Sequence, residues 1–165
     1  MKMETTLYRL KNAIARLGSR AFFNPPATED EIRDVEQKLN IVFPASLRQF
    51  YLTFNGGFFA DESWLEKDVT NVRQRETIQW NSNHILPLED IKSGFGNRYP
   101  KCVPVIHTHT QEFLAICNPL NNDESPVYDA FHEYPPHQWG ILYETFQDLL
   151  DDYINNDGNI KTIAV

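Results

Sequence analysis

Residues 43–57, "FPASLRQFYLTFNGG", constrain the fold most, because they carry both a start signal and a stop signal for one helix. Pro44 suits a helix start, where the missing N–H costs nothing. Apolar residues then recur at the i, i+3, i+4 and i+7 spacing of one helical face: Leu47, Phe50, Tyr51 and Phe54. Asn55 and two glycines end the run, as the C-terminus of a helix favours. This face carries no nucleophile or base, so we expect the segment to be structural scaffold and not part of a catalytic site.

Three further helices are indicated. Thr28 and Glu31 have the capping-box spacing at the start of an acidic helix that runs to Leu39. Helical periodicity also covers residues 4–17, which Gly18 closes, and residues 145–154, which Asp157 and Gly158 follow.

Three short runs rich in β-branched and aromatic residues predict strands: "VPVIHTH" (103–109), "EFLAICN" (112–118) and "PVYDAFH" (126–132). Their close spacing favours an antiparallel meander. "IQW" (78–80) is a candidate short strand, and "ILPLEDI" (85–91) a candidate edge strand or turn. Helices followed by strands and a last helix predict an α+β fold, and a length of 165 residues predicts one domain.

The chain shows no compositional sign of export or membrane insertion. Its first residues carry charges throughout, so we see no signal peptide, and no apolar stretch approaches the ~18 residues of a membrane span. Cys102 and Cys117 lack a CxxC spacing. Their even number allows a disulfide, but we expect reduced, buried thiols in a cytoplasmic protein.

The net charge of −8 is unevenly distributed, because residues 102–160 contain no lysine or arginine. The carboxylates of this base-free half are Glu112, Asp123, Glu124, Asp129, Glu133, Glu144, Asp148, Asp151, Asp152 and Asp157. Such a surface argues against direct nucleic-acid binding, which requires basic groups. It favours a basic protein partner; a solvated face that only maintains solubility is the alternative.

The sequence offers little for catalysis. His107 and His109 would share one face of a strand and could bind a metal with His132, Glu133 or His137, although a solvent-facing strand explains them more simply. "GFGN" (94–97) lacks the context of a phosphate-binding loop, so a turn is favoured. Adjacent carboxylates on a helix do not face each other. We therefore expect no enzyme, no cofactor and no metal.

A second candidate surface combines aromatic residues with prolines among the acidic ones. Its aromatic members are Tyr128, Phe131, Tyr134 and Trp139, and Pro135 and Pro136 lie between them. Aromatic side chains beside carboxylates suit binding of a basic protein. Strand alternation would bury about half of these rings.

Residues 27–57 resemble the signature of the SUKH superfamily, the Smi/Knr cell-wall regulator family. The resemblance rests on a capped acidic helix, a Phe-Pro step, and an aromatic helix that ends in Asn-Gly-Gly. Later blocks follow in the same order and extend it to about residues 27–154. It implies an α+β fold with a mixed or mostly antiparallel sheet, helices packed against that sheet, and no catalytic residues.

The resemblance also implies a role. Bacterial members of the family are typically immunity proteins that neutralise a cognate toxin, often a nuclease, while fungal members regulate cell-wall synthesis. A nuclease presents a basic groove, which the base-free half of this chain could occupy. A scaffold of the cell-wall regulator type is the alternative. The residues expected to contact the partner are Asp148, Asp151 and Asp152, then Asp123, Glu124, Asp129 and Glu133.

Overall fold

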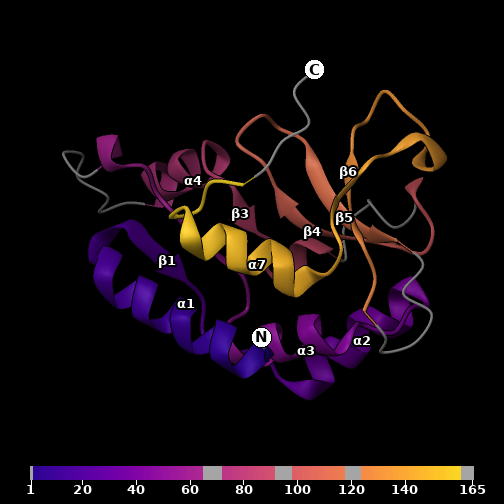
Figure 1. Cartoon of the computed structure of the whole chain (residues 1–165), viewed down its shortest axis with the longest axis horizontal. Helices are drawn as coiled ribbons and strands as arrows, with labels where there is room; N and C mark the ends of the chain where they lie inside the picture. The colour runs from indigo at the N-terminus through magenta and orange to yellow at the C-terminus, as the bar shows by residue number, and fades with distance from the viewer. Residues whose placement is uncertain (1, 65–71, 92–97, 118–123, 161–165) are drawn as a thin grey trace.

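A computed structural model describes residues 2–64, 72–91, 98–117 and 124–160 of the chain (Figure 1). Its helices are α1 Met3–Leu17, α2 Glu29–Leu39, α3 Ala45–Thr53, α4 Val72–Trp80, α5 Leu88–Ile91 and α7 Phe146–Asn155. Its strands are β1 Ala21–Phe23, β2 Gly57–Phe59, β3 His84–Ile85, β4 Cys102–His107, β5 Phe113–Cys117, β6 Val127–Ala130 and β7 Ile141–Tyr143. No helix in these ranges is long and apolar enough to cross a membrane.

The strands form one seven-stranded antiparallel sheet in the order β1-β2-β3-β4-β5-β6-β7. The predicted α+β fold is therefore confirmed, as is the antiparallel meander, which corresponds to β4, β5 and β6. The sequence did not reveal β1, β2, β3 and β7, each of which spans only two or three residues. "IQW" (78–80) is wrong as a strand, since it ends α4. "ILPLEDI" (85–91) is wrong as an edge strand: Ile85 ends β3, which is paired on both sides, and Leu88–Ile91 form α5.

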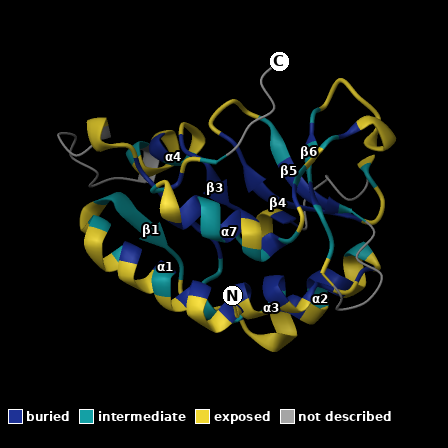
Figure 2. Cartoon of the chain, viewed as in Figure 1, coloured by how far each residue is buried: buried dark blue, intermediate teal, exposed yellow. Residues whose placement is uncertain are grey.

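Helices α1, α3 and α7 share the main hydrophobic core with one face of the sheet (Figures 1 and 2). Phe50 of α3 is fully buried and lies edge-on to Phe146 of α7, with the ring centroids 5.7 Å apart. Burying a side chain of this size contributes about 1.5–3 kcal/mol. The predicted scaffold role of residues 43–57 is consistent with this placement.

The ends of α2 and α3 follow from their sequences. Thr28 and Glu31 form the expected capping box, in which the Thr28 hydroxyl accepts from the Glu31 N–H at 3.1 Å and Glu31 Oε1 accepts from the Thr28 N–H. At the end of α3, Asn55 Oδ1 accepts the Leu88 N–H at 2.8 Å and so holds the start of α5. The backbone turns at Gly56 with a φ of 79°. Helix α3 ends at Thr53, with Phe54 already extended, so Phe54 lies outside the helix predicted to carry it. Asn55 and Gly56 then lead into β2 at Gly57.

The opposite face of the sheet is covered in two places. Ile78 of α4 packs with Phe58 of β2, while Trp139 packs with Cys102 and Ala115 of the central strands. A row of residues that face one another across successive strands connects the two places: Phe22, Phe58, His84, His107, Phe113 and Ala130. This outer face carries the groups that the sequence singled out for chemistry.

Candidate functional site

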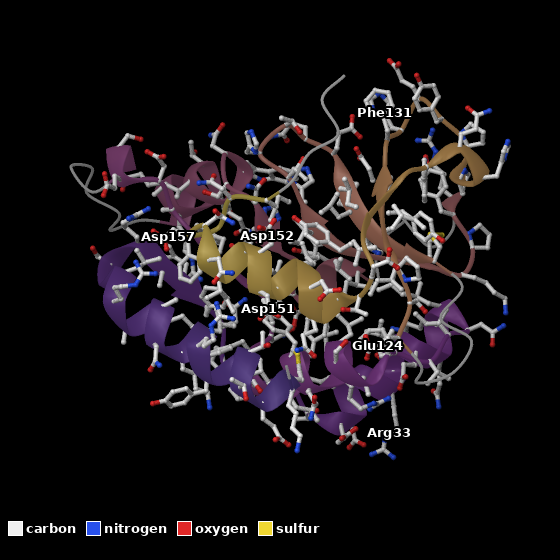
Figure 3. All side chains as sticks on the ribbon, viewed as in Figure 1. Arg33, Glu124, Phe131, Asp151, Asp152 and Asp157 are labelled. Carbon is white, nitrogen blue, oxygen red and sulfur yellow. A yellow bond between two sulfur atoms is a disulfide. The ribbon has the colours of Figure 1, made fainter. Side chains whose placement is uncertain are left out.

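Helix α7 brings together three of the predicted partner-binding carboxylates, two of which make contacts within the chain (Figure 3). Asp151 Oδ1 accepts from the Thr6 hydroxyl at 2.9 Å and pairs with Arg9 at 3.0 Å, which ties α7 to α1. Asp152 accepts from the Tyr143 hydroxyl at 2.5 Å. Asp148 lies in the first turn of α7 and is exposed. Within this group, Asp148 is therefore the exposed carboxylate, whereas Asp151 and Asp152 are half-buried.

Glu124 lies beside the start of α3 (Figure 3). Its Oε1 accepts the Ser46 N–H at 3.0 Å, and its Oε2 accepts the Ser46 hydroxyl at 2.6 Å. Pro44, the residue before α3, has no side chain that can cap the helix. Glu124 therefore acts as a cap supplied from a distant part of the sequence. Asp123 lies outside the described residues.

Asp129 and Glu133 are close in sequence but differ in setting. Asp129 is half-buried in β6, and this burial, with the nearby Glu112 charge, raises the pKa of its carboxyl. Glu112 in turn accepts from His132 Nδ1 at 2.6 Å. Glu133 is exposed in the loop between β6 and β7. In the described part of the predicted set, the acidic residues are distributed over α7, the start of α3 and the β6–β7 region.

The two histidines of the His-x-His motif have different surroundings. His107 is buried, 4% exposed, and its ring packs against Trp80, His84 and Phe113. His109 lies beyond β4, and its Nδ1 is 3.0 Å from Asn83 Oδ1. No group of three or more metal-ligating side chains occurs among the described residues.

Cys102 and Cys117 form a disulfide, so the expectation of free thiols is wrong. The two residues face each other directly in the β4–β5 ladder, with Cα atoms 4.0 Å apart. The sequence predicted both strands but not their register. That register determines whether the two cysteines oppose each other.

An aromatic cleft of about 820 Å³ opens above this disulfide. The β6–β7 loop forms one wall, and residues 132–138 of that loop are all exposed. The lining residues are Arg98, Tyr99, Pro100, Cys102, Cys117, Tyr128, His132, Glu133, Tyr134, Pro135, Pro136, His137 and Trp139. Most of the predicted aromatic–proline surface thus lies in one cleft.

Only one of the four predicted aromatic residues is buried, fewer than the half expected from strand alternation, because β6 ends at Ala130 and three of the four rings follow it in the loop. Trp139 is 6% exposed, and its Nε1–H donates to the carbonyls of Phe131 and Tyr134, which fixes the loop. Tyr134 is 51% exposed, whereas Tyr128 and Phe131 are half-buried. Exposed aromatic rings on a fixed loop are suited to protein recognition. Sequence reasoning missed Tyr99 and Arg98, which precede β4 and complete the cleft.

Comparison with known proteins agrees with this architecture. The family model described as the SMI1 / KNR4 family (SUKH-1) matches residues 26–152. A search of curated proteins gives no significant match. The matched region includes α2, α3, the sheet from β2 to β7 and most of α7. The chain belongs to the SMI1 / KNR4 (SUKH-1) family.

Proposed function

We propose that this protein is a non-enzymatic immunity protein that binds and neutralises a cognate toxin, with a basic, nuclease-type toxin as the best fit. The observation that carries the proposal is the base-free half of a SUKH-1 chain, residues 102–160, with its ten carboxylates. Opposite charge on a nuclease surface would speed the encounter and favour the correct orientation.

The contacts within the chain show which of the predicted carboxylates can be replaced without disturbing the fold. Asp151, Asp152 and Glu124 accept hydrogen bonds from other parts of the fold, so replacing them would disturb the protein itself. Glu133 and Asp148 are exposed. Tyr134 in the aromatic cleft is exposed as well. Replacing Glu133, Asp148 or Tyr134 therefore tests the proposed partner surface with the least damage to the fold.

Charge reversal of Glu133 and Asp148 is expected to weaken protection of cells that express the cognate toxin. The E133K/D148K variant should lower toxin affinity about tenfold or more, because two attractive charges become repulsive. Protection is scored as survival over a series of toxin induction levels. Circular dichroism and urea unfolding of each purified variant check its fold.

Glu4→Lys is the matched control for Asp148→Lys. Glu4 is also an exposed acid in the first turn of a helix, so its reversal carries the same unfavourable interaction with the helix dipole. It lies on α1, outside the base-free half, and should leave protection unchanged. Equal survival with E133K/D148K and E4K would mean that the acidic half is only a solvated face.

A further inference from the structure

The Cys102–Cys117 disulfide lies in an open cleft, where a reagent can approach it without unfolding of the sheet. We propose that this bond is a site of S-thiolation: a small thiol bearing carboxylates enters the aromatic cleft and exchanges with the disulfide at Cys117 Sγ. This proposal is independent of the toxin-binding function.

Access favours attack at Cys117. Cys102 is 4% exposed, whereas Cys117, the last residue of β5, is half-buried, and both line the cleft of about 820 Å³. Thiol–disulfide exchange requires a thiolate to reach a sulfur atom, so access is a primary determinant of its rate. The cleft has room for the body of a tripeptide-sized thiol beside the sulfur.

Strand pairing beyond the disulfide would hold β4 and β5 together after its cleavage. Beyond the disulfide, the β4–β5 ladder continues through Val103–Ile116 and Pro104–Ala115 to His107–Phe113. The cysteines are separated by 15 positions, a short loop whose ends the strand pairing already holds together. A disulfide stabilises mainly by limiting the unfolded chain, and less for short loops. Cleavage would therefore change the floor of the cleft and leave the sheet in place.

A permanent positive charge at the edge of the cleft favours an anionic thiol. Arg98 lines the cleft, as does the carboxylate of Glu133, while His132 pairs with Glu112. The Arg98 guanidinium lies 5.3 Å from the centre of the Tyr99 ring, at the exposed edge of the cleft. Although residues 102–160 contain no lysine or arginine, Arg98 brings a permanent positive charge to this surface. Such a charge attracts carboxylates and favours thiolate over thiol.

The exchange balances without a further oxidant or reductant. The attacking thiolate forms a new S–S bond to Cys117 Sγ, the bond between the two cysteines breaks, and Cys102 leaves as a thiolate that takes a proton from water. A second thiol can attack the mixed disulfide, which releases the small symmetrical disulfide and the Cys117 thiolate. The net result is one protein disulfide reduced and two small thiols oxidised.

The test is the rate of glutathionylation of the folded, full-length protein. The protein is incubated with reduced glutathione at neutral pH, quenched with acid and measured by intact mass spectrometry, both with and without urea. We expect the native rate to lie within about tenfold of the rate for the unfolded chain. A native rate lower by about a thousandfold or more would overturn the proposal, because that is the protection of a bond exposed only by global unfolding.

A second measurement tests the charge argument. Arg98→Gln should slow the reaction with glutathione about threefold at low salt and leave the reaction with uncharged 2-mercaptoethanol unchanged. Lys11→Gln, which removes an exposed charge on α1, is the matched control and should affect neither thiol. Equal slowing of both thiols in R98Q would contradict electrostatic selection of an anionic thiol by the cleft.

Discussion

Replacing Gly56 by alanine is expected to lower the free energy of unfolding by about 3–5 kcal/mol. Two effects add at this position. The φ of 79° is unfavourable for a residue with a side chain. An added Cβ would also lie 2.6 Å from the carbonyl oxygen of Ile85 and 2.7 Å from the nitrogen of Pro87, which are backbone atoms that no change of rotamer can move.

Gly18→Ala separates the two effects. Gly18 also has a positive φ, 56°, but nothing lies within 4 Å of the place where its Cβ would be. We expect a loss of about 1–2 kcal/mol from backbone strain alone. Urea unfolding followed by circular dichroism measures both variants. Equal losses for G56A and G18A would show that the close contact between residue 56 and the β3–α5 segment has no energetic weight.

Acidification is expected to destabilise the fold through His84 and His107, which face each other on β3 and β4. Burial lowers the pKa of both rings; for His107, with His84 nearby, it falls to about 4 from the ordinary 6.5. Below pH 6.5 the histidines of the unfolded chain bind protons that the folded protein excludes. The free energy of unfolding therefore decreases as the pH is lowered, until the folded rings are protonated too. His107 alone should contribute a loss of about 2 kcal/mol between about pH 7.5 and about pH 5.

Urea unfolding at these two pH values measures the effect. His107→Phe should reduce the pH dependence, since it replaces the titrating ring with an apolar one among Trp80, His84 and Phe113. It also removes a buried Nδ1 that has no hydrogen-bond partner. His137→Gln, at an exposed position, should keep the full dependence. A wild-type slope in H107F would mean that the buried pair does not control acid stability.

Sequence reasoning succeeded where the signal is local. The capping box at Thr28, the stripe on α3 and the long apolar-periodic run of α7 depend on near neighbours in the chain, and each element was found within one or two residues of its observed ends. The three central strands were found for the same reason. The remaining strands are too short for an alternating pattern to develop, so only pairing with their neighbours defines them.

The candidate site was harder to predict because it depends on contacts distant in sequence. Glu124 and Ser46 are 78 positions apart, and Asp151 and Arg9 are 142 apart, so nothing near these carboxylates indicated their use within the fold. The disulfide depends on strand register, which the apolar pattern did not fix. Composition could show that residues 102–160 are acidic, but only the fold shows which carboxylates are exposed.

The most direct test of the proposed function is a calorimetric titration of this protein with a purified candidate toxin, sought among the products of the genes next to its own. At about 50 mM salt we expect tight binding, and at about 500 mM salt an affinity at least tenfold weaker, because salt screens exposed charges. Tight binding that salt does not weaken would still support the immunity function, but it would mean that apolar contacts and not charges form the interface. Absence of binding at both salt concentrations would contradict the account.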